Sequence, residues 1–235
     1  MPSPSETPLL ILAGGRATRL RDLSDDRPKF LLPIRDGLLF ADFQLRWVKA
    51  QGFREVCLSV GYRGEQIEAY CGDGARFGLA ISYAFDSPIA LGTGGAVKRA
   101  FRVPPPWLAV LYGDTILTLN CSEALARATS DVLAVMTLLK DPPAGHICNA
   151  TVLDGWPLYS KRDPKPGWRY IDYGFLCLSA EFIRGMPETT PLDLSLPLEV
   201  ASNARKVGAL EVRERFWEVN TPDSLEELRR HFSNR

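Results

Sequence analysis

The sequence predicts an α/β fold in which helices cover both faces of a largely parallel sheet. Short apolar runs bounded by Gly, Pro or Asp alternate with stretches whose apolar residues recur at helical spacing, which is typical of βαβ units. The expected strands are residues 9–13, 55–60, 80–85, 107–113 and 131–139. The first half of the chain is therefore expected to be a three-layer α/β unit.

Helices are expected between these strands. In residues 38–53, Leu39, Phe43, Trp47 and Ala50 recur at the spacing of one helical face. Two shorter helices are expected at residues 64–72 and 94–101.

The pattern changes after about Lys140. The strand-like residues 147–153 and 170–179 are separated by a turn at Asp154–Gly155 and by the Pro- and Gly-containing stretch 161–168. This predicts a hairpin-rich insertion that forms the second wall of a cleft. The chain then ends in a strand and a helix that begins at Thr221 or its neighbour, with a proline in its first turn.

The composition excludes several classes of protein. Lys plus Arg and Asp plus Glu are equal at 28 each, so no overall field recruits nucleic acid or an anionic membrane. The first apolar run has no basic region before it and is too short for a signal peptide or a membrane span, so we expect a cytoplasmic protein. The five cysteines are widely spaced and form no C-x-x-C pair, which indicates neither a disulfide framework nor a zinc site.

The segment AGGRATRL, at the expected end of the first strand, suggests an anion-binding loop. Ligands of open α/β sheets lie at the carboxyl ends of the strands. Gly14 and Gly15 would let backbone N–H groups approach an anion, while Arg16 and Arg19 would neutralise its charge. The spacing fits neither a P-loop nor a dinucleotide-binding motif. A plain glycine turn with solvated arginines is the alternative.

Three further features are candidates for the same chemistry. Lys29 follows a proline, so its charge would be presented from a rigid base, although a solvated surface lysine is the alternative. The small residues Gly92–Gly95 open a helix and permit close approach of a ligand, unless they form a plain loop. Asp114 ends an apolar strand, where it could hold Mg²⁺ or form a turn.

The order of the motifs is more informative than any one of them. In their order along the chain, the motifs resemble those of the sugar-1-phosphate nucleotidyltransferases, and the resemblance covers almost the whole chain. The motifs are AGGRATRL, DRPKFLLPI, LGTGGA, YGDT, YSKRD, YIDYG and WEVNTPDSLEEL. The compact branches that transfer guanylyl groups to heptose 1-phosphate or uridylyl groups to N-acetylmuramate 1-phosphate look most similar. The resemblance implies a Rossmann-like sheet, Mg²⁺ as cofactor, and attack by a sugar 1-phosphate on the α-phosphorus of an NTP.

The resemblance also implies one domain over residues 1–235, with 1–115 mainly binding the NTP and 116–235 mainly binding the sugar phosphate. The implied catalytic residues are Arg19, Lys29 and Asp114. The implied nucleotide-binding residues are Leu12, Ala13, Gly14, Gly15, Gly92 and Thr93. The implied sugar-phosphate-binding residues are Gly94, Lys161, Asp172 and Gly174. The implied metal ligands are Asp114 and Glu218.

The chain departs from the pattern of the family at three places. Ala17 stands where a glycine is usual, and the usual Glu before Lys161 is absent. Glu218 and Asn220 stand where the family usually has the Asp and Gly of D-x-G-T. Glu218 keeps a carboxylate at this position, but its side chain is longer than that of Asp.

The implied reaction explains the residue types. Two polyanions must meet, so charge neutralisation and positioning supply most of the catalysis, and the anionic acceptor needs no general base. We accordingly expect His146 and His231 to be structural or solvent-exposed. The expected substrates are an NTP, with GTP favoured, and a hexose or heptose 1-phosphate; the oligomeric state is not predicted.

Two alternatives stay open at this point. One is a cytidylyltransferase for a non-sugar phosphate such as phosphocholine or a cyclitol phosphate, because aromatic side chains would bind choline by cation–π contact. The aromatic residues in question are Trp156, Tyr159, Trp168 and Tyr170. The other alternative is a catalytically weak, nucleotide-binding regulatory subunit.

Overall fold

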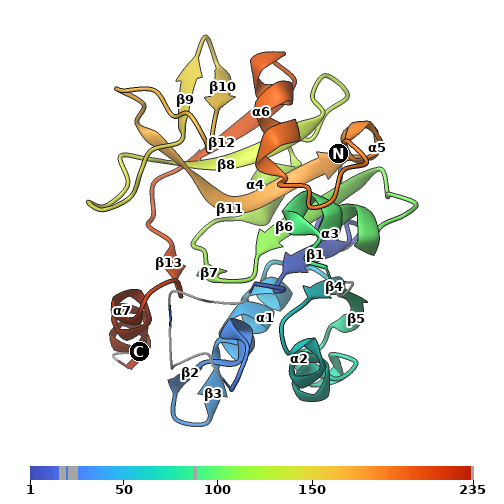
Figure 1. Ribbon diagram of the computed structural model, residues 1–235, viewed down its shortest axis with the longest axis vertical. Coiled ribbons are helices and arrows are strands. Elements are labelled where there is room, and N and C mark those ends of the chain that lie inside the picture. Colours follow the sequence, from blue (N-terminus) through green and yellow to red (C-terminus); the bar gives the residue numbers. More distant parts are fainter. Residues whose placement is uncertain (16–19, 21–25, 87–88, 234–235) are drawn as a thin grey trace.

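A mixed nine-stranded sheet forms the centre of the protein, as the computed structural model shows for residues 1–15, 20, 26–86 and 89–233 (Figure 1). The strand order is β10-β9-β11-β6-β1-β4-β5, and β8 pairs with both β11 and β12. The strands are β1 (Leu9–Leu12), β4 (Glu55–Val60), β5 (Ala80–Phe85), β6 (Trp107–Tyr112), β8 (Ala134–Lys140), β9 (Ala150–Leu153), β10 (Trp156–Tyr159), β11 (Tyr170–Ser179) and β12 (Val207–Val212). Two small ribbons pair β2 (Pro33–Arg35) with β3 (Leu38–Leu39) and β7 (Thr115–Ile116) with β13 (Trp217–Glu218).

Helices cover both faces of the sheet. The α-helices are α1 (Phe40–Ala50), α2 (Gly64–Cys71), α3 (Gly92–Ala100), α4 (Cys121–Leu125), α5 (Ala180–Gly185), α6 (Ser195–Asn203) and α7 (Pro222–Ser233), and two 3₁₀ turns are η2 (Lys29–Leu31) and η3 (Ala75–Phe77). Along β1, Leu9 and Ile11 pack into one apolar cluster with α1, whereas Leu10 packs into a second cluster with α3. Both faces of the strand are therefore buried, which confirms the predicted three-layer α/β architecture.

The first half of the chain supplies the parallel part of the sheet. β1 lies parallel to β4 and β6, and β4 lies parallel to β5. These four strands were predicted from their apolar runs. Because they are parallel, their carboxyl ends share one edge of the sheet, and the loops that follow them lie close together there.

The second half makes the sheet mixed. β11 runs antiparallel to β6 and β8, and the predicted turn at Asp154–Gly155 joins β9 to β10 as a hairpin. Both turn residues have positive φ, 52° and 81°, which Asp and Gly tolerate best. The sequence pattern missed β12, because Gly208 and Ala209 weaken its apolar run and its place is set by pairing with β8.

The chain then returns to its first half through β13 and α7, which lie beside β7 and β2 (Figure 1). The predicted helix start is confirmed: α7 begins at Pro222, and Thr221 Oγ1 accepts a hydrogen bond from the Ser224 N–H at 3.2 Å. The Arg229 guanidinium donates to the Pro33 carbonyl at 2.9 and 3.0 Å. None of the helices in the described ranges is both long and apolar enough to cross a membrane.

Candidate active site

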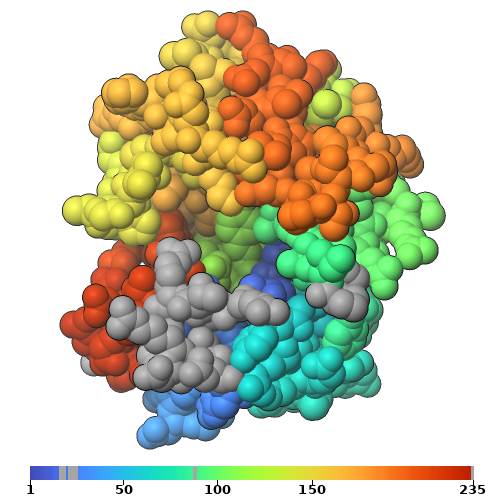
Figure 2. All heavy atoms as spheres, viewed as in Figure 1, coloured from blue at the N-terminus to red at the C-terminus, as the bar shows by residue number. Residues whose placement is uncertain are grey.

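A cavity of about 860 Å³ lies where the loops after the parallel strands meet the second half of the chain. Figure 2 shows the front face hollowed between the blue, cyan and green lower part and the yellow and orange upper part. Predicted site residues from both halves line it: Leu12, Ala13, Gly14, Gly15, Lys29, Gly92, Thr93, Asp114, Lys161, Asp172 and Glu218. The predicted residue Arg19 and its neighbour Arg16 lie outside the described residues.

The glycines after the strands allow the backbone segments of this wall to approach one another. A β carbon on Gly113 would lie 2.5 Å from the Leu12 carbonyl oxygen, and one on Gly61 would lie 2.7 Å from the Gly14 carbonyl oxygen. Both distances are shorter than real contacts allow. A β carbon on Gly15, by contrast, would meet no atom of the described residues within 4 Å.

Lys29 is held inside the cleft and is not a solvated surface lysine. It opens η2, whose next two residues, Phe30 and Leu31, are buried and anchor the turn. Its side chain is 15% exposed, and Nζ lies 3.2 Å from Asp114 Oδ2 and 2.7 Å from Asn220 Oδ1. The ammonium group has three N–H donors, and contacts with the described residues use two of them.

The ribbon of β7 and β13 brings Glu218 near Asp114. Glu218 pairs with Thr115, directly after Asp114 in the chain, and the Val219 N–H donates to the Asp114 carbonyl at 2.9 Å. Both carboxylate side chains are 29% exposed and line the cavity. Their approach depends on the pairing of Glu218 with Thr115, 103 positions apart, which the sequence pattern alone does not reveal.

These residues fit a magnesium ion. Asp114 and Asn220 already direct side-chain oxygens at a cation, the Lys29 ammonium group, and Glu218 adds a second carboxylate. Mg²⁺ uses one or two protein carboxylates and takes its other ligands from phosphate and water. In the described part of the chain, no group of three or more His, Cys, Asp or Glu side chains forms a site able to hold a metal by itself. The donor set therefore suits a metal that arrives with a phosphate.

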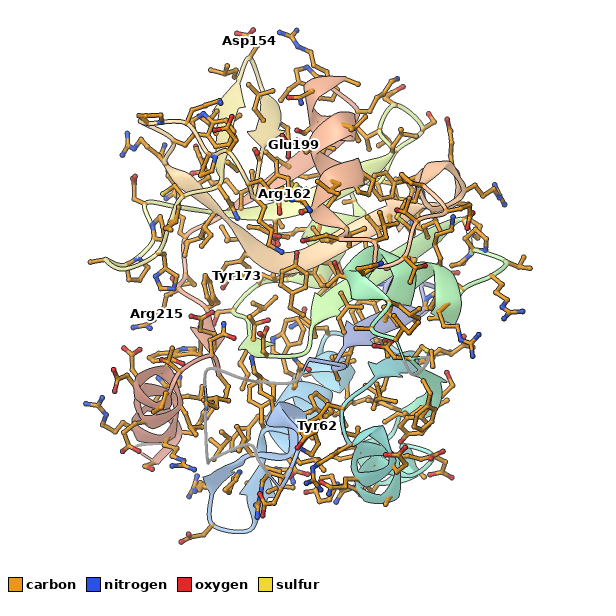
Figure 3. All side chains as sticks on the ribbon, viewed as in Figure 1. Tyr62, Asp154, Arg162, Tyr173, Glu199 and Arg215 are labelled. Atoms are coloured by element: carbon orange, nitrogen blue, oxygen red, sulfur yellow. The ribbon has the colours of Figure 1, made fainter. Side chains whose placement is uncertain are left out.

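The second half contributes a paired lysine. Lys161 follows β10 and directly precedes Arg162 in the chain, a residue that Figure 3 labels in the upper part of the molecule. Its Nζ lies 3.0 Å from Asp193 Oδ2, and the Ser195 N–H holds Asp193 Oδ1 at 3.0 Å. Partial burial opposes ionisation of Asp193, but the hydrogen bonds from Ser195 and Lys161 outweigh it and lower its pKa. Asp193 therefore supplies the carboxylate partner of Lys161, which no local sequence signal indicated.

Asp172 is fixed by hydrogen bonds at the floor of the same region. The Tyr112 hydroxyl donates to Oδ2 at 2.6 Å, and the Gly174 N–H donates to Oδ1 at 3.0 Å. Burial raises the pKa of Asp172, although both hydrogen bonds counteract it. Its remaining acceptor capacity is available to a hydroxyl donor of a ligand.

Gly94 and Gly174 do not line the cavity. Gly94 packs against Leu192, since a β carbon there would lie 2.8 Å from Leu192 Cγ. Gly174 has a φ of +97° at the irregularity in β11, where glycine is the residue that fits. Direct contact of either residue with a sugar stays a prediction.

Asp86 is a cavity residue that sequence analysis missed. It directly follows β5, and an acidic residue at the end of a parallel strand is the signal that could have found it. Burial raises its pKa, and its buried Oδ1 has no hydrogen-bond partner among the described residues. It is therefore an acceptor available at the end of the cavity formed by the parallel strands.

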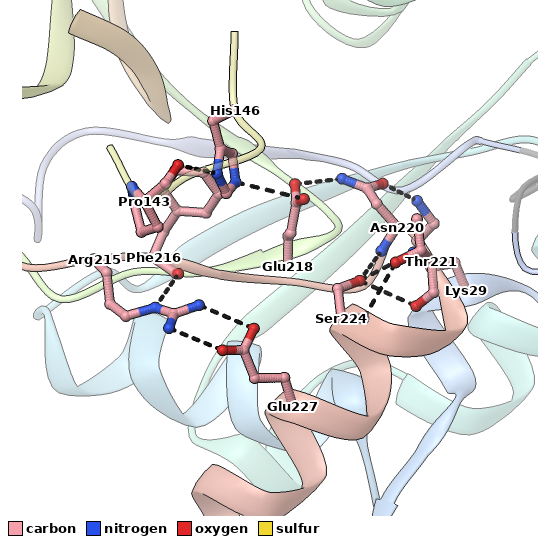
Figure 4. Close-up of polar contacts among 10 residues, drawn as sticks. All are labelled: Lys29, Pro143, His146, Arg215, Phe216, Glu218, Asn220, Thr221, Ser224 and Glu227. Atoms are coloured by element: carbon pink, nitrogen blue, oxygen red, sulfur yellow. Dashed lines mark hydrogen bonds and ion pairs between the residues drawn. The ribbon is translucent and has the colours of Figure 1, made fainter. Parts of the chain in front are cut away.

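The two histidines differ in their surroundings. His231 stacks on Trp217 with ring centroids 4.1 Å apart, which agrees with a structural role. His146 lines the cavity, and its Nε2 lies 3.8 Å from Glu218 Oε1, while its Nδ1 lies 3.1 Å from the Pro143 carbonyl oxygen (Figure 4). His146 is thus a wall residue of the cleft, which the sequence did not indicate.

The fold and this cleft agree with the comparisons to known proteins. The family model for nucleotidyl transferases matches residues 9–143, more than half of the chain, and the protein belongs to this family. Among its relatives, D-glycero-alpha-D-manno-heptose 1-phosphate guanylyltransferase of Campylobacter jejuni is 36% identical over 126 residues, which cover 54% of this chain and 56% of the relative. N-acetylmuramate alpha-1-phosphate uridylyltransferase of Neisseria meningitidis is 32% identical over 139 residues, 57% of this chain and 59% of the relative. The matches thus span little more than half the length of these relatives.

A solved structure matches nearly the whole chain. HddC from Yersinia pseudotuberculosis, complexed with GMP-PN, superposes with a TM-score of 0.77 at 22% identity and covers 96% of this chain and 99% of that one. This likeness confirms the predicted Rossmann-like fold.

Proposed function

We propose that the protein transfers a nucleoside monophosphate from an NTP to a sugar 1-phosphate, releasing pyrophosphate. The observation that carries this proposal is a single cleft with one lysine from each half, Lys29 beside Asp114 and Lys161 beside Asp193. Such a cleft can hold two phosphorylated ligands against each other. The names of the relatives from C. jejuni and N. meningitidis describe the same class of reaction.

The chemistry follows from the charges of the cleft. An oxygen of the acceptor phosphate forms a bond to the α-phosphorus of the NTP, and the bond from that phosphorus to the bridging oxygen of pyrophosphate breaks. Lys29 stabilises the negative charge that develops on the leaving group, and Lys161 holds the acceptor phosphate in line. Mg²⁺ held by Asp114 and Glu218 would further neutralise phosphate charge.

GTP is the NTP that we propose. The relative from C. jejuni is a guanylyltransferase, and Asp86, which lines the cavity, has a carboxylate oxygen with no hydrogen-bond partner among the described residues. Guanine carries neighbouring N–H donors, which a carboxylate accepts together. We further propose a hexose or heptose 1-phosphate as acceptor and a cytoplasmic location, which agrees with five unpaired cysteines.

The aromatic residues that kept a choline-containing acceptor open lie mostly outside the cavity. Of the four aromatic residues that kept this alternative open, Tyr159 lines the cavity, whereas Trp156, Trp168 and Tyr170 do not. Other aromatic rings do line the cavity, those of Tyr62, Tyr112, Tyr173 and Phe216 among them, so phosphocholine is included in the test below.

The direct test is a matrix of the four NTPs against several sugar 1-phosphates, with phosphocholine included, measured as pyrophosphate release in the presence of Mg²⁺. We expect the fastest release with GTP and a hexose or heptose 1-phosphate. Thermal stabilisation by NTP without pyrophosphate release in any combination would identify a binding subunit and contradict the proposal.

Replacing Lys161 with alanine should weaken use of the acceptor far more than binding of the nucleotide. The variant loses a charged hydrogen-bond donor on the acceptor side, so we expect KM for the sugar phosphate to rise about tenfold or more. Calorimetry should find nearly unchanged NTP affinity. Lys165→Ala is the matched control, because Lys165 pairs with Asp163 on the exposed face of the same loop. Loss of NTP affinity with an unchanged acceptor KM would reverse the roles given to Lys29 and Lys161.

A further inference from the structure

The side chain of Asn220 joins the two charged groups at the nucleotide side of the cleft (Figure 4). Its Oδ1 accepts a hydrogen bond from Lys29 Nζ at 2.7 Å, and its Nδ2 donates a short hydrogen bond to Glu218 Oε2. Lys29 also contacts Asp114, so the amide lies between a lysine and carboxylates that are far apart in the sequence. All four residues line the cavity.

The two partners fix the orientation of the amide. An ammonium group only donates hydrogen bonds and an ionised carboxylate only accepts them, so Oδ1 must face Lys29 and Nδ2 must face Glu218. An aspartate at position 220 would lack the donor, and an apolar residue would lack both functions. An amide side chain is therefore suited to connect these two charges.

The backbone of Asn220 is fixed as well. Its N–H and that of Thr221 both donate to Ser224 Oγ at 3.0 Å, at the beginning of α7. The preceding residue, Val219, is tied to the Asp114 carbonyl at 2.9 Å. The helix start and the β7–β13 ribbon thus hold Asn220 from both sides, and the amide has a defined place in the cleft wall.

We propose that Asn220 is a positioning residue that holds the Lys29 ammonium group and the Glu218 carboxylate in fixed places relative to each other. This proposal rests on the proposed function, because it assigns the two groups to the phosphates of the same reaction. The amide restrains the lysine so that its remaining donor is directed to the nucleotide. It also restrains the longer Glu218 side chain, which otherwise has more rotamers than an aspartate. The arrangement lowers the entropic cost of ordering both groups when the substrates bind.

The first test measures nucleotide binding without metal. In EDTA, calorimetry on the wild type, Asn220→Ala, Lys29→Ala and the double variant gives a double-mutant cycle. We expect Asn220→Ala to weaken NTP affinity severalfold, up to about tenfold, because the lysine loses a charge-assisted hydrogen bond. The double variant should bind no more weakly than Lys29→Ala, since Asn220 acts through that lysine.

The second test measures turnover with Mg²⁺. Asn220→Ala should lower kcat by about tenfold or more and raise the Mg²⁺ concentration for half-maximal activity, whereas KM for the sugar phosphate should change little. Glu218→Gln combined with Asn220→Ala should cost less than the product of the two single effects. Asn120→Ala is the matched control, because Asn120 caps α4 outside this cavity, with its side chain accepting from the Ser122 N–H at 3.0 Å. Asn220→Ser replaces the alanine variant in both tests if the latter does not fold.

Failure of this inference is distinguishable from failure of the proposed function. If the wild type shows no pyrophosphate release with any substrate pair, the proposed function is wrong. If the wild type is active and Asn220→Ala matches it in metal-free NTP affinity, kcat and Mg²⁺ dependence, the positioning role is wrong. Fully multiplicative effects in both cycles would also overturn it, because Asn220 would then act independently of Lys29 and Glu218.

Discussion

Replacing Lys29 with alanine is expected to lower turnover by about 10²-fold or more while the fold is retained. The ammonium group is half of a charge pair with Asp114 and lines the cavity, so the variant loses electrostatic stabilisation of the departing pyrophosphate. The loss should persist at saturating NTP, because the contact matters most in the transition state. Steady-state pyrophosphate release at saturating NTP and acceptor measures it.

Lys49→Ala is the control for this experiment. Lys49 lies on α1 and its Nζ donates to the Gly78 carbonyl at 2.7 Å on the exposed surface, so its loss removes a lysine without touching the cleft. Thermal unfolding of both variants should show that the protein stays folded. Near-normal turnover of Lys29→Ala under these conditions would remove Lys29 from the catalytic residues.

Replacing Asp114 with asparagine is expected to raise the Mg²⁺ concentration needed for activity by about tenfold or more, and Glu218→Gln should do the same to a smaller extent. Each change removes a negative charge from a ligand of the proposed metal, and Asp114 should have the larger effect because the longer Glu218 side chain loses more rotamer freedom when it binds a metal. Titration of turnover with Mg²⁺ at fixed NTP gives both values.

Asp141→Asn controls for the loss of an acidic side chain. Asp141 pairs with Arg169 on the exposed surface, at 2.6 Å between Oδ2 and Nη2, away from the cavity. Glu218 would not be a ligand of the metal if Glu218→Gln left turnover and Mg²⁺ dependence unchanged. The same outcome for Asp114→Asn would place the metal elsewhere in the cleft.

The local pattern of the sequence was enough to place the nucleotide side of the cleft. Runs such as residues 9–12 and 107–112 are apolar because both faces of a central parallel strand are buried, and this leaves a clear signal. Glycines and Asp114 directly after those runs then fall at the carboxyl edge of the sheet. The order of these motifs along the chain also indicated the family, which the comparison with known proteins confirmed.

The pairs of charged residues in the cleft could not be predicted in the same way. β7 and β13 are two residues each, too short to show an alternating pattern, so the approach of Glu218 to Asp114 leaves no local signal. Asp193 is joined to Lys161 across 32 positions of the chain. His146 likewise became a cavity residue only when the two halves of the chain came together.

By itself, the sequence determined the α/β class, the family and the residue types available for phosphate chemistry, because strands, turns and glycine loops depend on neighbouring residues. Apart from Asp114 and Glu218, which the family resemblance already assigned to one metal, only the tertiary structure decided which charged groups lie together. Lys29 reaches Asp114 across 85 positions and Asn220 across 191, and the amide of Asn220 connects the lysine to Glu218. Such contacts depend on how strands pair and how α7 packs back on the first half of the chain. The distances between these side chains therefore depend on the packing of the whole molecule, and no local sequence pattern predicts them.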